Sequence, residues 1–362
     1  MKRPDPPAGL HSRTTGEARR GSALSPAKLL ALLADGAELS GSALAARLGI
    51  TRAAVWKQIE QLRALGLPID ASAARGYRLD APIETLDAKR IAAAISPEQR
   101  AHVGEIAVFW QIDSTSSELL RRAGESAAPR ACLAEIQTQG RGRRGRAWHM
   151  PLAGGVALSL FRRFDGGMAA LSGLSLVAGI AVLRALEDCG VGGAALKWPN
   201  DVVAEGRKLA GVLVELGGDA LGPCHAVIGV GINLRIGAKQ GTMIDQPWTD
   251  VAALSADRVP SRNLLAGRML SRLAEALDAF ADAGFGAFAS EYAKHDVLLD
   301  RRVAVSNGSH VWEAVAKGVT SRGTLKVVRD GAEVEIDSGE VSVRRGEDHE
   351  ARRSGEGRNP VP

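Results

Sequence analysis

The segment QTQGRGRRGRAW, residues Gln137–Trp148, stands between two apolar segments, Ala131–Ile136 and Gly154–Phe161. Within it, four arginines alternate with three glycines over residues 140–146. Glycine lets the backbone approach a ligand and turn its N–H groups toward it, and arginine binds phosphate or carboxylate through paired hydrogen bonds. An isolated Arg/Gly run is more often a disordered nucleic-acid-binding patch. The apolar flanks favour a loop on a folded domain that binds an anion such as a nucleotide.

Apolar or alternating segments around this loop predict a mixed α/β domain over residues 83–295. The expected strands are EIAVFWQI (105–112), ACLAEIQTQ (131–139), GGVALSLFRR (154–163), KLAGVLVEL (208–216) and HAVIGVGIN (225–233). Amphipathic or apolar helices are expected near Leu171–Leu186 and Asn263–Phe280. The uncharged stretch Gly166–Leu183 contains four glycines and two serines, so we predict a buried helix there and no membrane span.

Residues 27–82 have the pattern of a winged helix-turn-helix. Ser25-Pro26, Ser40 and Thr51 are helix-start signals, and Gly49 ends the second helix. The segment LPIDASAARGYRL (67–79) predicts two strands that form a wing. In this motif the last helix presents its first residues to the major groove of DNA. The expected DNA-facing residues are Thr51, Arg52, Ala53, Trp56 and Lys57.

Two alternatives stay open for this N-terminal segment. The pattern alone also fits a plain three-helix bundle with a basic, solvated face. The bulk of Trp56 would equally allow this side chain to pack under the wing.

The C-terminal part has five short strand patterns over residues 296–345, with turn signals at Asn307-Gly308, Ser321-Arg322-Gly323 and Asp330-Gly331. These predict a small SH3-like β-barrel. Residues 1–26 and 346–362 are poor in apolar side chains and are expected to be disordered. The whole chain is therefore predicted to be an α+β multidomain protein.

Composition narrows the function classes. The 362 residues include 45% hydrophobic and 24% charged side chains, which excludes wholesale disorder. The net charge is +5, but residues 1–21 alone contribute +3 and residues 27–80 only +2, so one copy of the helix-turn-helix would bind DNA weakly.

The three cysteines lie far apart and predict neither a disulfide nor a zinc site. No apolar secretory segment begins the chain, so we expect a cytoplasmic protein without membrane contact.

Two further motifs carry groups suited to binding. Lys197-Trp198-Pro199-Asn200-Asp201 is followed by Arg207-Lys208-Leu209-Ala210-Gly211, which places an amide, a carboxylate and a cation near strand ends. Gly229-Val230-Gly231-Ile232-Asn233 ends another strand with little side-chain bulk. Each motif alone is weak, since the first would also fit a tight turn over a core tryptophan.

Taken in this order with Asp113-Ser114-Thr115, these motifs resemble the biotin protein ligases, in the two-role form that also represses biotin synthesis genes. The resemblance runs from about residue 27 to 344. It implies a class II synthetase-like catalytic sheet, formation of biotinyl-5′-AMP from biotin and ATP with Mg²⁺, and transfer of biotin to a lysine of the biotin carrier protein of acetyl-CoA carboxylase. It also implies binding of operator DNA by a homodimer that forms when the adenylate is bound.

The resemblance assigns roles to individual residues. Arg143, Lys208 and Asp201 are expected to be catalytic, the two cations at the carboxylate and α-phosphate and Asp201 as a proton acceptor. The expected biotin-binding residues are Ser114, Thr115, Ser116, Gln137, Arg141, Gly142, Arg143, Lys208 and Gly211. The expected nucleotide-binding residues are Arg143, Arg146, Trp148, Asn200, Asn233 and Trp248. Metal ligands are not readable from the sequence.

Two other functions compete with this interpretation. A lipoate or octanoate ligase would share the fold and the adenylate chemistry, but a linear acyl chain would leave the polar groups of Ser114, Thr115 and Gln137 unpaired. A transcription factor that only senses an adenylate would not require Lys208, Asp201 and the arginine loop. We therefore expect a ligase that activates biotin.

Overall fold

The computed structural model describes residues 26–72, 75–125, 130–255, 258–307, 310–337 and 341–345. The segments expected to be disordered, 1–26 and 346–362, lie outside these ranges except for Pro26, which begins the first helix. The chain divides into two compact units, Met1–Pro82 and Ile83–Pro362. Each unit is described by itself below.

The N-terminal unit is a winged helix-turn-helix, as the sequence predicts. Its elements are α1 (Pro26–Leu33), α2 (Gly41–Leu48), α3 (Arg52–Ala64), β1 (Ile69–Ser72) and β2 (Gly76–Leu79). The side chains of Ser40 and Thr51 cap α2 and α3 by accepting from the backbone N–H groups of Ala43 and Ala54. Strands β1 and β2 pair as an antiparallel hairpin, the wing.

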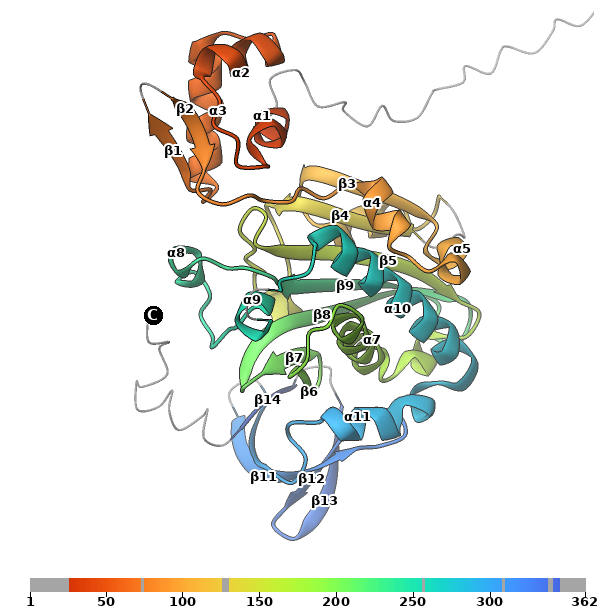
Figure 1. Ribbon diagram of the computed structural model, residues 1–362. Coiled ribbons are helices and arrows are strands. Elements are labelled where there is room, and N and C mark those ends of the chain that lie inside the picture. Colours follow the sequence, from red (N-terminus) through yellow and green to blue (C-terminus); the bar gives the residue numbers. More distant parts are fainter. Residues whose placement is uncertain are drawn as a thin grey trace, which may run out of the picture. The chain divides into compact units, whose positions relative to one another are not determined.

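The core of the second unit is a seven-stranded mixed sheet in the order β3-β4-β5-β9-β8-β7-β6 (Figure 1). Only β3 and β4 run parallel, and the other neighbours are antiparallel. The strands are β3 (Glu105–Ile112), β4 (Arg130–Gln137), β5 (Gly155–Phe164), β6 (Ala195–Lys197), β7 (Asp201–Ala204), β8 (Arg207–Gly218) and β9 (Cys224–Asn233). The five predicted strands are confirmed, whereas β6 and β7 are too short for a periodic signal.

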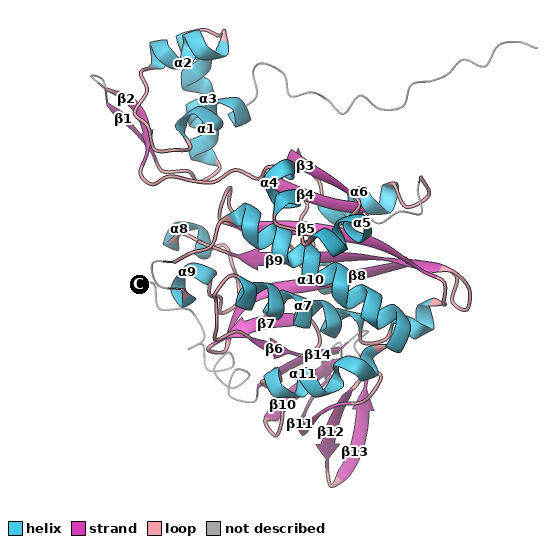
Figure 2. Ribbon diagram, turned by 45° about the vertical axis from the view of Figure 1, so that its right-hand side comes forward, coloured by secondary structure: helices cyan, strands magenta, loops and turns pink. Residues whose placement is uncertain are grey.

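The two faces of this sheet are covered unequally. Helices α7 (Leu174–Asp188) and α10 (Arg262–Ala283) lie side by side over one face and bury the main hydrophobic core, as both views show (Figures 1 and 2). On the opposite face, α6 (Thr115–Arg121) packs on Cys132 and Phe161, which alternate with main-core residues along their strands. Most of α7 is buried, so the prediction of a core helix is confirmed.

Shorter helices complete the described part of this unit. They are α4 (Ala88–Ala93), α5 (Arg100–Val103), α8 (Ala238–Gly241), α9 (Val251–Leu254) and α11 (Ala289–His295). Among the described residues, no helix is long and apolar enough to cross a membrane. Cys132 and Cys224 are buried, Cys189 is partly buried, and all three are free thiols.

The C-terminal part is a small antiparallel sheet in the order β13-β12-β11-β10-β14, which confirms the predicted five strands. The strands are β10 (Arg302–Asn307), β11 (His310–Val319), β12 (Leu325–Arg329), β13 (Ala332–Ile336) and β14 (Val341–Arg345). Its inward side chains, among them Val303 and Leu325, belong to the same hydrophobic cluster as α7 and α10. This sheet and the catalytic sheet therefore share one core.

A buried ion pair ties α10 to the seven-stranded sheet. Arg262 Nη2 lies 2.9 Å from Glu135 Oε2, and both side chains are 4% exposed. Arg262 also donates to the backbone carbonyls of Gly155 and Glu84, and Glu135 accepts from the N–H of Leu86. The pair thereby holds β4, β5 and the chain that follows the N-terminal unit in one place.

Removal of this arginine should strongly destabilise the second unit. Arg262→Ala leaves a buried carboxylate without its partner, which costs about 3–5 kcal/mol. We expect a correspondingly lower free energy of unfolding in urea. Arg272→Ala on the same helix removes partly exposed pairs with Asp188 and Glu275, and solvent screens such pairs, so its cost should be about 1 kcal/mol or less. Equal losses in the two variants would contradict this account.

Candidate active site

The arginine-glycine loop leaves the sheet at the end of β4 and closes on itself. Trp148 N donates to Gly140 O at 2.8 Å, and Gly142 N donates to Arg146 O at 2.7 Å. Between these bonds Arg144 has a φ of 59°, so the loop makes a tight turn at its tip. The backbone of the loop is thus fixed at its base while its arginine side chains project from a short turn.

This loop forms one wall of a cavity of about 330 Å³. The strands β5, β7, β8 and β9 supply the floor and the opposite wall. Predicted site residues that line the cavity are Ser114, Ser116, Gln137, Arg141, Gly142, Arg143, Arg146, Trp148, Asn200, Asp201, Lys208 and Gly211. Ala147 of the loop and three residues of the Gly229–Asn233 motif, Gly229, Val230 and Gly231, also line the cavity. Lining residues that sequence reasoning missed are His149, Ala157, Val212, Leu213, Met243, Asp245 and Gln246.

Glycines make room for the indole of Trp148. Gly211 and Gly231 face each other on β8 and β9. A Cβ atom on Gly231 would overlap the Trp148 ring, and one on Gly211 would come within 3.2 Å of it. The ring therefore lies against bare backbone, which explains the low bulk of the Gly229–Asn233 motif. Its buried Nε1 has no hydrogen-bond partner among the described residues.

Cations gather at the β7–β8 side of the cavity. Lys208 Nζ lies 2.7 Å from Asp201 Oδ1 and 5.5 Å from the centroid of the Trp148 ring. Arg143 Nη1 donates to Asn200 Oδ1 at 3.4 Å. Burial lowers the pKa of the Arg143 guanidinium, while Asp201 acts in the opposite direction. Arginine nevertheless stays charged at neutral pH, so this side of the cavity attracts anions.

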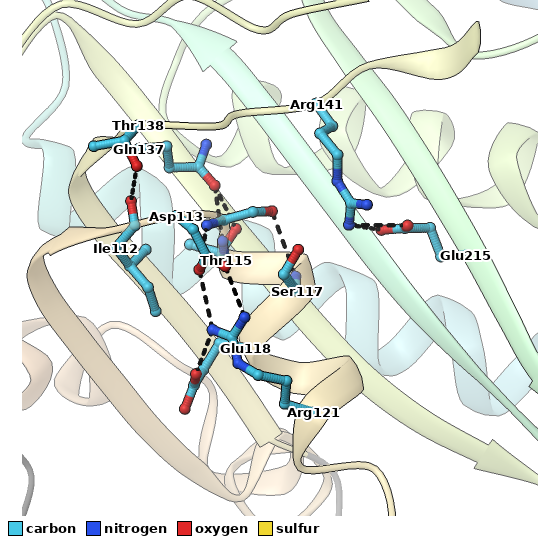
Figure 3. Close-up of polar contacts among 11 residues, drawn as sticks. Ile112, Asp113, Thr115, Ser117, Glu118, Arg121, Gln137, Thr138, Arg141 and Glu215 are labelled. Atoms are coloured by element: carbon cyan, nitrogen blue, oxygen red, sulfur yellow. Dashed lines mark hydrogen bonds and ion pairs between the residues drawn. The ribbon is translucent and has the colours of Figure 1, made fainter. Parts of the chain in front are cut away.

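The β3–β4 side of the cavity is lined by uncharged polar groups. Thr115 Oγ1 lies 3.1 Å from Gln137 Oε1 (Figure 3). It also lies 2.8 Å from Ser159 Oγ, and Ser159 Oγ in turn lies 2.9 Å from Ser116 Oγ. Thr115 is buried in this network and does not line the cavity. Ser159 is a functional candidate that sequence reasoning missed; its only signal is one hydroxyl in the apolar strand GVALSLF.

The turn before α6 is fixed by charge. Arg121 donates to both carboxylate oxygens of Asp113, at 2.7 and 3.0 Å (Figure 3). Asp113 also accepts from the N–H of Ser114, whose side chain lines the cavity. These hydrogen bonds, above all those from Arg121, lower the pKa of Asp113 to about 2. On the arginine-glycine loop, Arg141 pairs with Glu215 of β8 at 3.0 Å (Figure 3).

Two predicted nucleotide-binding residues use their polar groups on the protein itself. Asn233 Nδ2 donates to Thr249 O, and Trp248 Nε1 donates to Gly241 O. Both residues line a smaller hollow that shares Trp148 and Lys208 with the main cavity. Their side chains hold the backbone of residues 241–249, and this segment borders the smaller hollow.

The expected DNA-facing residues all lie on the surface of their unit. Thr51, Arg52, Ala53, Trp56 and Lys57 are exposed, and the hydroxyl of Thr51 caps α3. Trp56 is 59% exposed, which rules out the alternative that it packs under the wing. The first turns of α3 thus present one aromatic and two cationic side chains to solvent.

Comparisons with known proteins agree with this architecture. Residues 108–233 match the Biotin/lipoate A/B protein ligase family, and residues 27–78 match a helix-turn-helix domain family. The catalytic unit is therefore that of a ligase, joined to a DNA-binding module.

Similarity to curated proteins extends over most of the chain. The chain is 38% identical over 322 residues to the bifunctional ligase/repressor BirA of Salmonella typhimurium. This match covers 89% of this chain and 98% of that protein. The Escherichia coli protein of the same name is also 38% identical, over 324 residues. Among solved structures, the biotin protein ligase of Aquifex aeolicus in complex with biotin and ATP is 28% identical, with a TM-score of 0.57, covering 67% of this chain and 99% of that one. The chain belongs to the family of bifunctional biotin protein ligases and repressors.

The Asp113–Arg121 pair makes a testable prediction. Arg121→Gln should raise the pKa of Asp113 from about 2 toward 3.8, because its strongest hydrogen-bond donor is lost. An NMR titration of the side-chain carboxyl would measure this. A lowered pKa means that the pair stabilises the fold above about pH 4 and loses this effect as the pH falls toward 2. Arg122→Gln, which removes pairs with Glu105 and Glu125, should leave Asp113 unchanged; a similar shift in both variants would refute the assignment.

Proposed function

We propose that this protein is a biotin protein ligase that forms biotinyl-5′-AMP from biotin and ATP and then transfers biotin to a lysine of the biotin carrier protein of acetyl-CoA carboxylase. One observation carries the proposal, namely a single cavity with uncharged hydrogen-bonding groups beside β3 and β4 and cations beside β7 and β8. Several strands separate the two sides, at roughly 4.8 Å per strand. That span suits a ureido ring at one side and a carboxylate meeting a phosphate at the other.

At the uncharged side, Ser114, Ser116 and Gln137 hold the biotin ring, with Gly142 and Arg141 beside it. Thr115 acts indirectly, because its hydroxyl orients Gln137 and Ser159. Gly211 lines the cavity beside Lys208 and Trp148, where the chain that leads to the carboxylate would pass. Membership of the family supports these assignments.

Adenylation needs charge stabilisation and no general base. The carboxylate oxygen of biotin, an anion at neutral pH, attacks the α-phosphorus of ATP, and the bond to the pyrophosphate oxygen breaks. Negative charge that builds on the phosphate oxygens is stabilised by Arg143 and Lys208. Lys208 is held for this role by Asp201 and by the Trp148 ring.

Magnesium enters this scheme as part of the substrate. Among the described residues, no group of three or more His, Cys, Asp or Glu side chains could hold a metal. Mg²⁺ commonly binds through substrate phosphates and water. We therefore assign Mg²⁺ to the ATP that the site binds.

The nucleotide lies against Trp148, with Arg146 and Asn200 beside it. The indole face that is turned away from the backbone of β8 and β9 stacks on the adenine ring. Asn233 and Trp248 hold the backbone of the segment that borders the smaller hollow.

The second step transfers the acyl group. The carrier lysine first loses a proton from its ammonium group, and the neutral amine then attacks the carbonyl carbon of biotinyl-5′-AMP, so that an amide bond forms and AMP leaves. Asp201 is the carboxylate at the cationic side of the cavity and is our candidate for accepting this proton.

A lipoate or octanoate ligase remains the alternative within the same family. It would leave the hydroxyl and amide groups of Ser114, Ser116 and Gln137 without partners. An adenylate-sensing factor without transferase activity is a second alternative. Pyrophosphate–ATP exchange with biotin or octanoate, followed by the mass of a carrier domain, separates all three functions.

Removal of Lys208 should abolish most of the adenylation rate. Loss of one charge-assisted contact to the transition state costs about 2–4 kcal/mol, or about 30- to 1000-fold in rate. Lys208→Ala should therefore slow biotin-dependent pyrophosphate exchange by this factor. Arg207→Ala is the matched control, since the neighbouring Arg207 pairs with Glu205 and does not line the cavity. Near-normal single-turnover rates for Lys208→Ala would remove this lysine from the mechanism.

The N-terminal unit makes the protein a biotin-responsive repressor, with Arg52, Trp56 and Lys57 facing operator DNA. A net charge of +2 over residues 27–80 is modest for one copy, so we propose that a homodimer supplies the phosphate contacts of two copies. An adenylate that binds better to the dimer-competent state must strengthen the dimer.

Mobility shifts on the promoter of the organism's own biotin synthesis genes test this role. Biotin plus ATP should tighten DNA binding. Lys57→Ala should weaken it, and the slope of log K against the logarithm of the salt concentration should become shallower by about 1. Lys28→Ala, on α1, is a control with the same charge change outside the predicted interface. Binding that ignores biotin and ATP at every salt concentration would leave the protein a ligase only.

A further inference from the structure

The turn between β6 and β7 has two functional sides. Asn200 and Asp201 line the cavity, whereas Trp198, two residues earlier, is 1% exposed and lies in the main hydrophobic core. Nothing described above gives Trp198 a part in the reaction. Its indole nevertheless makes one polar contact, and that contact reaches a distant part of the chain.

Trp198 Nε1 donates to the backbone carbonyl of Gly323 at 3.1 Å. Gly323 belongs to the turn between β11 and β12 of the C-terminal sheet. This turn is stiff, because Thr320 N donates to Thr324 O and the two threonine hydroxyls lie 2.7 Å apart. The carbonyl that receives the indole is therefore held at a fixed position.

The same glycine packs directly on the catalytic domain. Gly323 has a φ of +80°, and a Cβ atom there would lie 2.7 Å from the Cα of Gly173, just before α7. A side chain would force the two backbones apart. The turn is thus seated against the base of α7 without any intervening side chain.

The remaining bonds of the β6–β7 turn lie further along it. Pro199 O accepts from Ser175 Oγ at 2.9 Å, and Asn200 exchanges two hydrogen bonds with the backbone of Val212, at 2.7 and 2.9 Å. These bonds fix the cavity side of the turn to α7 and β8. The indole of Trp198 fixes its buried side.

We infer that Trp198 is a positioning residue for adenylation, and that the β11–β12 turn of the C-terminal sheet supports the active site through the carbonyl of Gly323. This inference rests on the proposed ligase function. Groups that stabilise developing charge act only when they are held in place beforehand, and a displacement of about 1 Å can cost on the order of 100-fold in rate. The Trp198–Gly323 bond holds in place the turn that carries Asn200 and Asp201.

Trp198→Phe tests the bond, because it keeps an aromatic ring and removes the N–H. We expect the kcat of biotin-dependent pyrophosphate exchange to fall by about 5- to 30-fold, the range of one lost hydrogen bond to a buried carbonyl. The Kd for biotin alone should change much less than kcat, because the biotin ring is held at the uncharged side of the cavity by groups of α6 and β4. A variant that merely loosened the whole fold would weaken both.

Ser172→Ala is the matched control. The hydroxyl of Ser172 donates to Arg322 O at 2.7 Å, one carbonyl away in the same turn, and Ser172 is not part of the cavity. This variant loosens the docking of the C-terminal sheet to a similar extent but does not touch the β6–β7 turn. Its kcat should therefore stay near that of the wild type.

Hydrogen exchange in the ligand-free protein gives a second readout that needs no activity. Peptides that cover residues 197–201 should exchange faster in Trp198→Phe than in the wild type or in Ser172→Ala. If the wild type shows no biotin-dependent pyrophosphate–ATP exchange, the ligase function is refuted. Hydrogen exchange would still decide whether Trp198 holds the β6–β7 turn. The inference would be overturned if Trp198→Phe kept the kcat of the wild type and its protection of residues 197–201 from hydrogen exchange. It would also be overturned if Trp198→Phe and Ser172→Ala lost kcat and protection equally.

Discussion

The cavity depends on the contact of the Trp148 ring with the bare backbone of Gly211 and Gly231. A sheet that packs helices on one face normally covers its other face as well, or exposes side chains there. Here β8 and β9 have no Cβ atoms at these two positions, so the ring lies close to the strands. The ring in turn places the end of the arginine-glycine loop over the sheet. A side chain at Gly231 would move both ring and loop and fill the space that a ligand needs.

Electrostatics then divides the cavity along the order of the strands. The Lys208–Asp201 pair lies on β8 and β7, and the hydroxyls of Ser114 and Ser116 follow β3. The arginine-glycine loop spans the distance between them. A ligand that is neutral at one end and anionic at the other thus meets complementary groups throughout, without the burial of an unpaired polar group.

The sequence was sufficient to predict five of the seven strands of the central sheet and most residues that line the cavity, because the site is built from motifs at strand ends and from glycines within strands. The sequence was insufficient where a residue's role depends on tertiary contacts with distant segments of the chain. Ser159 looks like any other residue of an apolar strand until its neighbours on α6 are known. Trp198 could be predicted as a core residue and Ser321-Arg322-Gly323 as a turn, but nothing in the sequence shows that two residues 125 positions apart form a hydrogen bond. Strand-end motifs predict where a site lies, and only packing reveals what supports it.

The segment that follows Pro82 connects the two units and is bound tightly to the catalytic sheet. Arg262 donates to Glu84 O and to Gly155 O, and Gly155 pairs on β9 with Asn233 at the smaller hollow. The same arginine therefore contacts both the connecting segment and the first residue of β5, which lies opposite Asn233 at the smaller hollow. Because Arg262 and Glu135 are almost fully buried, they have little freedom to shift without disturbing the strands and the segment that they hold together.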